Sequence, residues 1–451
     1  MSVRNVKRFI GIFVLAFLVI FIVVIIKLPQ SDDIVIGDYD IVIPENPDST
    51  VEVEPDPIPE IEPEPEPEPI PEEPKLEALS LSDEAMPDNL LKLADDYNVI
   101  GMSVVVIEDG AVSHSYVYGK QDRGDYGTEP VDFTSDSIIR VAGVSELVSA
   151  VGVMSLCEKG LLSLDDPIGN FLGYTVKNPK TDSEITLRQL MTHTAGVSDY
   201  GAYNEVVYGD IKYQTLKNML AGEHAKSNFY SYKPGYDYDF SNFGSAMIGC
   251  IVSSVAGESF NSYMTKNVFE PLAIDAGYYS TEIDNRSNIS TIYQRNEVNY
   301  TLQEMDEFAS ELSSVADIDN YRISHGNLFI SASGLSRIAQ LLLEKGSIGL
   351  VSVISPESVD SMLSTAAEGS LYKDVGKGLA VVVKDDIVPG RKLYGHGGAA
   401  YGSTAEIFID PTDKSGVILV CNGSLNTTDD TGFSLMAKAF IKEIYTSVIG
   451  K

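Results

Sequence analysis

Strand-forming segments stand at both ends of one long globular stretch of this chain, and largely helical sequence lies between them. Residues 100–119, IGMSVVVIEDGAVSHSYVYG, form two β-rich halves around Asp109-Gly110, a dipeptide that favours a hairpin turn. Toward the C-terminus three more runs with turn residues between them are typical of strands, at 376–386, 397–411 and 415–423. One sheet can include both groups only if a helical insertion separates them in the sequence. We therefore predict an α/β domain of the α+β type.

The N-terminus carries an unbroken apolar run, FIGIFVLAFLVIFIVVII, at residues 9–26, which is long enough for a transmembrane helix of minimal length. Three basic residues precede it, Arg4, Lys7 and Arg8. The positive-inside rule then predicts a cytoplasmic tail at 1–8, a signal-anchor helix at 9–28 and the rest of the chain outside the membrane. A cleaved signal peptide is the competing hypothesis, but KLPQSDD after the run has no small-x-small cleavage site.

Residues 29–78 are dominated by Asp, Glu and Pro, culminating in EPDPIPEIEPEPEPEPIPEEP at 54–74. Proline at every second position forbids helix and sheet ladders, and like charges repel, so we expect a disordered, extended spacer. At about 3.1 Å per residue, about 46 such residues could reach roughly 140 Å. The spacer would hold a domain at 79–451 away from a membrane, through or toward a cell wall.

The formal net charge of −34 excludes nucleic acid as a plausible partner, because a chain this acidic repels phosphates. The three cysteines, Cys157, Cys250 and Cys421, each lie in an apolar run and lack metal-ligand spacing. Their number is odd, which favours buried free thiols over a disulfide framework. We predict no metal and no cofactor.

Residues 138–168, IIRVAGVSELVSAVGVMSLCEKGLLSLDDPI, resemble the nucleophile helix of the serine β-lactamase and penicillin-binding-protein-like hydrolases. In that family a Ser-x-x-Lys motif opens the helix after an Arg-hydrophobic-Ala run, here Arg140, Val141 and Ala142. Other segments resemble further landmarks of the family in its order, namely ITLRQLMTHTAGV, KPGYDYDFSNFGSAMIGCIVSSVAGESF, NLFISASGLSRIAQLLLEKG and YGHGGAAYGSTAEIFIDP. The resemblance spans about residues 95–445 and is weakest at 281–326. It implies an antiparallel β-sheet flanked by helices plus a helical subdomain, and it implies that the membrane is that of a bacterial cell envelope.

The resemblance also implies a mechanism for which this chain lacks the reacting atoms. In the family a serine attacks a carbonyl, and a lysine one turn later on the same helix face takes its proton. Here these positions hold Gly143 and Glu146. The family's Tyr-x-Asn loop, whose tyrosine shuttles the proton and whose asparagine contacts the substrate amide, reads Phe240-Ser241-Asn242. Nucleophile, base and phenol are therefore all replaced.

The third family element, Lys or His followed by x-Gly, is present as His396-Gly397-Gly398. In the family, the backbone N–H groups of the nucleophile and of the residue after this triplet hold the oxyanion, here Gly143 and Ala399. Backbone donors survive the loss of side chains. The resemblance therefore implies a retained ligand or oxyanion pocket formed by Gly143, Asn242, Gly398 and Ala399.

Loss of the nucleophile or its base in a serine hydrolase costs about 10⁶ in kcat, or about 8 kcal/mol. We therefore predict a pseudoenzyme that binds a cell-wall peptide, another small amide or ester, or a protein partner. The alternative is an active D,D-carboxypeptidase, esterase or β-lactamase that uses a non-standard site.

Several residues could rescue activity or contribute to a site. Ser145 and Ser149 follow on the same helix, but they lie about 200° and 240° round from position 143. Ser370 and Lys373 match Ser-x-x-Lys by chance, at a place where the family has no catalytic residue. Glu146 and His396 together could support acid-base chemistry on water.

Two further predictions concern aromatic and imidazole side chains. His193 lies in a structural landmark of the family, so we expect a hydrogen-bonded packing residue. Tyr200, Tyr203 and Tyr208 either line a groove for a peptide or sugar or, as we favour, pack within a tyrosine-rich loop.

Overall fold

The computed structural model describes residues 74–125, 127–209, 212–294, 298–364, 376–425 and 427–450. The predicted cytoplasmic tail, the anchor helix and nearly all of the acidic spacer lie outside these ranges. In the part described, no single helix is long and apolar enough to cross a membrane. One bent pair of helices, Asn242–Ala256 and Phe260–Phe269, has the required length and apolar composition only when the two are taken together. The backbone N–H of Leu76 already donates to the Pro271 carbonyl (3.4 Å), so the last residues assigned to the spacer lie on the domain.

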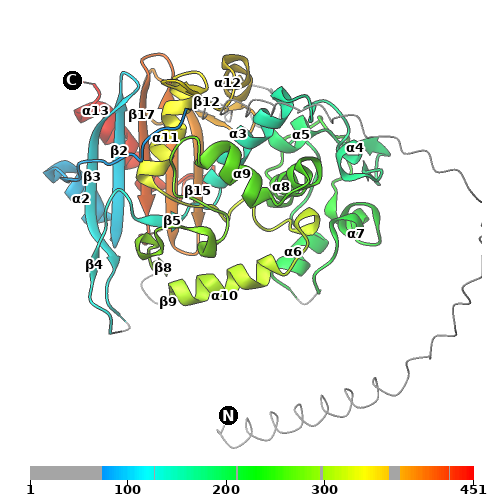
Figure 1. Cartoon of the computed structure of the whole chain (residues 1–451), viewed down its shortest axis with the longest axis horizontal. Coiled ribbons are helices and arrows are strands. Elements are labelled where there is room, and N and C mark those ends of the chain that lie inside the picture. The colour runs from blue at the N-terminus through cyan, green and yellow to red at the C-terminus, as the bar shows by residue number, and fades with distance from the viewer. Residues whose placement is uncertain are drawn as a thin grey trace, which may run out of the picture. The chain divides into compact units, whose positions relative to one another are not determined.

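The central sheet joins the two groups of strands that the sequence separates (Figure 1). Its order is β1-β3-β2-β17-β16-β15-β14-β13, with β4 paired to β3. These strands are β1 (Glu84–Ala85), β2 (Gly101–Glu108), β3 (Ala111–Asp122), β4 (Val131–Asp132), β13 (Gly376–Lys377), β14 (Val382–Lys384), β15 (Leu393–Ala400), β16 (Ser403–Asp410) and β17 (Ser415–Cys421). All pairs in this sheet are antiparallel except β1 with β3. The prediction of a sheet built from both ends of the domain is confirmed.

The pairing of β2 with β17 closes the sheet, with Met102 opposite Cys421 and Gly416 opposite Ile107. The predicted hairpin between β2 and β3 is also present. Asp109 and Gly110 have φ values of 50° and 79°, which a type I′ turn requires at both central positions.

Helices cover both faces of the sheet (Figure 1). On one face lie α2 (Asp88–Asp96) and α13 (Leu435–Ser447); on the other lie α3 (Val144–Glu158), α11 (Ala332–Leu343) and, farther from the sheet, α8 (Asn242–Ala256). The other helices are α4 (Ile168–Leu172), α5 (Leu187–Met191), α6 (Ala202–Val207), α7 (Leu216–Ala221), α9 (Phe260–Met264), α10 (Leu302–Ser313) and α12 (Pro356–Leu363). The short helical turns are η1 (Ala225–Asn228), η2 (Thr265–Phe269), η3 (Ser280–Glu282), η4 (Arg286–Asn288) and η5 (Asp317–Asp319).

Short two-stranded ladders lie apart from the central sheet. They pair β5 (Ile138–Arg140) with β10 (Phe329–Ser331), β6 (Lys177–Asn178) with β7 (Ser183–Glu184), β8 (Ile292–Gln294) with β9 (Val298–Tyr300), and β11 (Ser347–Ile348) with β12 (Val351–Ser352). The ladder of β5 and β10 leads directly into α3 and therefore helps to set where that helix begins.

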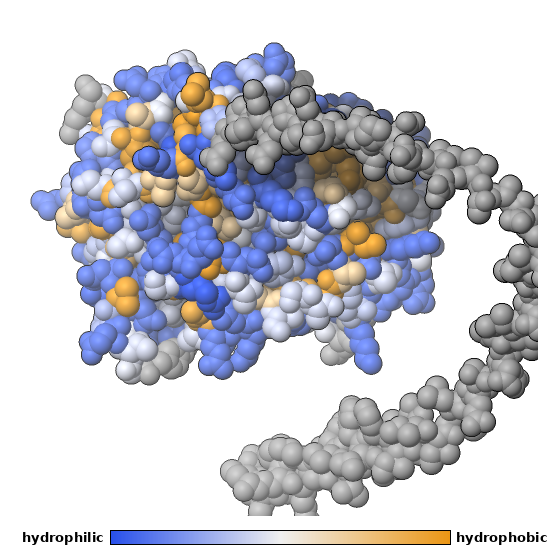
Figure 2. Space-filling model, in the orientation of Figure 1, coloured by the Kyte–Doolittle hydropathy of each residue, from blue (hydrophilic) through white to orange (hydrophobic). Residues whose placement is uncertain are grey.

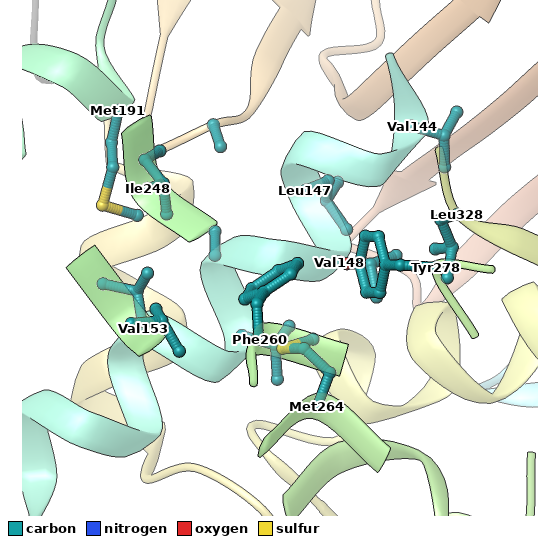
Figure 3. Packing of buried hydrophobic residues seen from close by; sticks show 14 of the residues in the cluster. Val144, Leu147, Val148, Val153, Met191, Ile248, Phe260, Met264, Tyr278 and Leu328 are labelled. Atoms are coloured by element: carbon teal, nitrogen blue, oxygen red, sulfur yellow. The ribbon is translucent and has the colours of Figure 1, made fainter. Parts of the chain in front are cut away.

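Alternation along the strands divides the interior into two main clusters, one on each face of the sheet. On β16, Ile407 and Ile409 belong to the larger cluster with α3, α8 and α11, whereas Phe408 packs with α2 and α13. Helix α3 is apolar on nearly all sides, and Figure 3 shows Leu147 and Val148 enclosed by neighbouring helices. On the visible part of the face in Figure 2, hydrophilic residues predominate and apolar ones form small separate groups.

Truncation of a buried side chain on α3 should measure how firmly this packing holds the helix. Leu147 is fully buried in the larger cluster, so Leu147→Ala should lower the free energy of unfolding by about 2–5 kcal/mol. Leu161, just after α3, is 51% exposed, and Leu161→Ala should change the free energy by less than about 0.5 kcal/mol. Chemical denaturation of both variants checks this; equal losses would contradict the packing described.

Candidate functional site

The backbone just before α3 makes a tight turn that delivers Gly143 to the helix N-terminus. Ala142 has a φ of 47°, which is uncommon for a residue with a Cβ. Two contacts with the strand region of β10 maintain the turn: the Val141 N–H donates to the Leu328 carbonyl (2.9 Å), and the Leu328 N–H donates to Ser145 Oγ (3.2 Å). Such a strained conformation persists where its surroundings determine it, so the position of Gly143 is well defined.

Gly143 lies in close contact with β15, the strand that carries His396-Gly397-Gly398. A Cβ added to Gly143 would stand 2.7 Å from the Gly397 carbonyl oxygen and 3.3 Å from Cε1 of His396. A Cβ on Gly398 would stand 2.5 Å from the Gly143 nitrogen. The two segments therefore approach closely because both are glycine at the contact. A serine at position 143 would require the backbone of β15 to move.

The structure brings the predicted oxyanion segments together. Gly143 and Gly398 are half-buried and Ala399 is exposed, so this contact reaches the protein surface. The use of the Gly143 and Ala399 N–H groups as oxyanion donors remains a prediction.

Glu146, at the position of the family's lysine, is only 1% exposed and lies in a polar cluster. Its Oε2 accepts a hydrogen bond from Ser245 Oγ of α8 (2.8 Å). The same oxygen lies 3.1 Å from His193 Nε2 and 3.7 Å from His396 Nε2. The pair of Glu146 and His396 considered from the sequence is therefore close in space, and His193 is the nearer imidazole.

The two imidazoles present different faces to the carboxylate. The Ser241 N–H donates to His193 Nδ1 (3.2 Å), so His193 carries its hydrogen on Nε2, the nitrogen nearest Glu146. His396 instead donates from Nδ1 to the Gly397 carbonyl (2.8 Å). Its Nε2 then faces Glu146 with a lone pair. His193 thus points its hydrogen-bearing nitrogen at the Glu146 carboxylate, whereas His396 presents a nitrogen without a hydrogen.

Burial and charge determine the protonation of this cluster. Burial alone would raise the pKa of Glu146, but His193, with His396 and Lys377, outweighs it and holds the pKa at about 2. Burial lowers the pKa of His396 to about 4 in spite of Glu146. Burial likewise lowers the pKa of Lys377, on β13, to about 8. At neutral pH the cluster therefore contains a Glu146 carboxylate and an uncharged His396 imidazole.

Asp199 organises the loop that precedes α8. Its carboxylate accepts from Ser241 Oγ, the Asn242 and Phe243 backbone N–H groups and Asn242 Nδ2, at 2.8–2.9 Å. A carboxylate at a helix N-terminus satisfies free N–H groups and complements the helix dipole. The side chain of Asn242, expected to face a ligand, is therefore already engaged through its amide nitrogen.

Phe240 covers the buried cluster from the outside. Its ring centroid lies 4.6 Å from that of His193, and its side chain is 46% exposed. A tyrosine would present a hydroxyl here, but Phe240 presents only an apolar ring. The third replaced position therefore lies next to His193, which in turn lies 3.1 Å from Glu146, the second replaced position.

The alternative serines do not reach this site. Ser149 Oγ is buried and lies within hydrogen-bond distance of the Ser145 carbonyl, the Ser324 carbonyl and the Tyr278 hydroxyl. Ser145 Oγ accepts from Leu328, as noted above. Ser370 and Lys373 lie outside the described residues.

Among the tyrosines considered from the sequence, Tyr203 is buried and stacks on Phe243, with ring centroids 4.8 Å apart. Tyr200 and Tyr208 are exposed, at 89% and 70%. The preference for packing therefore describes Tyr203 only, and the other two tyrosines are available at the surface.

The sequence interpretation missed three members of the site. His193 is buried and hydrogen-bonded as expected, but it also contacts Glu146. Asp199 and Ser245 were not singled out, because no local pattern marks them: each contacts the site across a large sequence separation.

Within the described ranges, no group of three His, Cys, Asp or Glu residues is arranged to hold a metal ion. Cys250 and Cys421 are buried free thiols, and Cys157 is a half-buried one.

Comparison with known proteins identifies the class to which this fold and site belong. The Beta-lactamase family model matches residues 86–439, and the chain therefore belongs to the β-lactamase family. The sequence is similar to protein flp of Staphylococcus aureus, with 23% identity over 39% of this chain and 34% of that protein. It is also similar to penicillin-binding protein 4* of Bacillus subtilis, with 25% identity over 41% of this chain and 38% of that protein. The match thus spans well under half the length of these relatives.

Solved structures show the same fold at low sequence identity. The octameric penicillin-binding protein homologue from Pyrococcus abyssi has a TM-score of 0.61 at 22% identity, covering 80% of this chain and 76% of that one. The D-amino acid amidase from Ochrobactrum anthropi SV3 has a TM-score of 0.62 at 15% identity, covering 81% and 99%. A class C β-lactamase has a TM-score of 0.61 at 16% identity, covering 80% and 94%. The predicted family and fold are confirmed.

The buried carboxylate should give the protein a distinctive dependence of stability on pH. The folded pKa of Glu146 is about 2, below the ordinary 4.5, so the anion stabilises the fold above pH 4.5 and loses this contribution as the pH falls toward 2. Glu146→Gln should therefore cost on the order of 3 kcal/mol at pH 7 and progressively less at lower pH. Denaturation of both proteins across this range measures the difference.

Glu406 on β16 is a matched control of opposite sign. It is equally buried, and burial raises its pKa well above the ordinary value in spite of Lys384. Ionisation of this group therefore destabilises the fold as the pH rises above 4.5, and Glu406→Gln should be neutral or stabilising at pH 7. A loss at Glu406→Gln equal to that at Glu146→Gln would contradict the electrostatic account.

Proposed function

We propose that this protein is a pseudoenzyme of the β-lactamase family, tethered to a membrane by its N-terminal helix, that binds a cell-wall peptide or a protein partner on the outer side. The observation that carries the proposal is the contact of Gly143 with β15. The nucleophile is missing, and the place of its Cβ lies only 2.7 Å from the Gly397 carbonyl oxygen. The reacting position is thus filled by backbone.

The position of the base supports the same proposal. A lysine in the family mechanism must accept a proton, but here Glu146 Oε2 already accepts from Ser245 Oγ and lies 3.1 Å from His193 Nε2. With its pKa held low, Glu146 is a poor proton acceptor at neutral pH. A loss of about 10⁶ in rate, equivalent to about 8 kcal/mol, is larger than the remaining groups can restore.

A binding role is supported by the surface around the filled position. Gly143 and Gly398 are half-buried, and aromatic rings next to them remain accessible: Phe240 is 46% exposed and Tyr401, in the turn after β15, is 38% exposed. Burial and then the nearby Tyr401 hydroxyl raise the pKa of Tyr208, so these two tyrosines lie close together. Exposed aromatic rings beside accessible backbone groups suit recognition of a peptide. The tether is supported by the apolar run at 9–26 and the acidic spacer.

Covalent labelling provides the direct test of lost chemistry. The full chain should not form a stable adduct with a fluorescent penicillin, and it should hydrolyse nitrocefin, simple esters and D-alanyl peptides no faster than a heat-unfolded sample. Labelling of the folded protein, or hydrolysis above that of the unfolded sample, would show an active enzyme with a non-standard site.

Restoring the family residues should test whether the geometry itself has changed. The triple variant Gly143→Ser, Glu146→Lys and Phe240→Tyr should remain unlabelled, because the side chain introduced at position 143 would collide with the Gly397 carbonyl. The double variant Glu146→Lys and Phe240→Tyr, which keeps Gly143, is the control. It separates the effect of burying a lysine among the histidines from the effect of the new side chain at position 143. Penicillin acylation of a folded triple variant would show that only side chains were lost and that β15 readily moves.

A further inference from the structure

Arg140 lies at the edge of the site in an unusual environment. It ends β5, three residues before Gly143, and is half-buried. Its guanidinium carbon lies 4.2 Å from the centroid of the Tyr401 ring and 5.7 Å from that of Phe308 on α10. A planar guanidinium is attracted to aromatic faces, so the two rings hold the side chain in one place.

No carboxylate pairs with Arg140 within the part of the chain that the structure describes. Five other arginines do have such partners: Arg123 with Asp125, Arg188 with Asp165, Arg286 with Asp306, Arg322 with Glu311, and Arg391 with Asp410 and Asp413. The groups that favour the Arg140 cation are the tyrosines Tyr401, Tyr208 and Tyr300, and its buried Nε has no partner among the described residues. Among the described arginines, Arg140 shares the lack of a carboxylate partner only with Arg337, whose guanidinium donates to the Glu77 backbone carbonyl instead.

This arrangement leaves a charge only partly compensated. Burial is the main influence on Arg140 and lowers its pKa, whereas the Tyr401 hydroxyl favours the charged form. A partly buried cation without an anion loses hydration that neutral partners restore only in part. A ligand anion that reached the guanidinium would supply the missing partner.

Two of the tyrosines that favour the Arg140 cation, Tyr208 and Tyr401, reach the protein surface. Tyr208, at the end of α6, is 70% exposed, and Tyr401 follows Ala399 by two residues. Phe308 and Tyr300 come from the segment where the chain resembles its family least; the Tyr300 and Tyr401 rings meet edge to face at 5.4 Å.

We propose that Arg140 is an anion subsite that binds a carboxylate of the ligand, against the exposed rings of Tyr401 and Tyr208. This assignment deepens the proposed function but rests only on the ligand reaching this surface. The planar guanidinium matches the two oxygens of a carboxylate. A dianionic phosphate is disfavoured, because Asp199 lies close enough to influence both Tyr208 and His325, and the domain repels multiple negative charge.

The test compares acetyl-D-alanyl-D-alanine with its C-terminal amide, which differs only in the carboxylate. Calorimetric titration of the full chain should show the acid binding at least about tenfold more tightly than the amide. Arg140→Gln should remove this preference and weaken binding of the acid by a similar factor. Tyr401→Phe, which keeps the ring, should have a smaller effect.

Arg322→Gln is the matched control. Arg322 faces the same Phe308 ring at 5.9 Å but is already paired with Glu311 (2.9 Å), so its loss should leave the preference for the acid intact. Equal binding of acid and amide by the unmodified chain, no binding of the acid, or an equal loss in the Arg322 variant would each overturn the proposal. The comparison in the unmodified chain holds even where Arg140→Gln fails to fold. Penicillin acylation would overturn the proposed function and leave this result unaffected.

Discussion

The close approach of the α3 N-terminus to β15 leaves no room for a side chain at position 143. It depends on two glycines, Gly143 and Gly398, each of which lacks the Cβ that would separate the segments. A strained turn at Ala142 and the hydrogen bond from Val141 to Leu328 hold the helix end in place. Position 143 carries no side chain, and the backbone of β15 lies where that side chain would begin.

Glu146 stands where the family has a lysine, so the buried charge at this position is negative rather than positive. The neighbouring residues are arranged to stabilise a negative charge. Ser245 and His193 both direct hydrogens to the carboxylate, and the Ser241 backbone selects the tautomer of His193 that allows it. A buried carboxylate without such donors would cost several kcal/mol. We therefore expect these neighbours to contribute to the stability of the fold by holding Glu146 in its ionised form.

At the rim of the same site the electrostatic balance is different. Glu146 has a hydroxyl donor and three basic side chains near its carboxylate, whereas Arg140 has aromatic neighbours and no anion in the described part of the chain. A buried charge with hydrogen-bonding partners contributes to the stability of the fold. A charge near the surface that lacks a counter-ion is available to bind an oppositely charged ligand. This contrast separates the buried reacting position from the accessible surface that we propose binds a ligand.

Patterns in the amino-acid sequence were enough to predict the central sheet, the family and the three replaced positions. Alternation of apolar residues, the Asp109-Gly110 turn and the spacing of Gly143 and Glu146 are local patterns, and local patterns are set by backbone geometry over a few residues. Three features could be seen only in the tertiary structure: the contact of Gly143 with Gly397, the contact of His193 with Glu146, and the aromatic neighbours of Arg140. Each of these depends on distances between elements that lie far apart in the chain, and packing rather than local preference sets such distances.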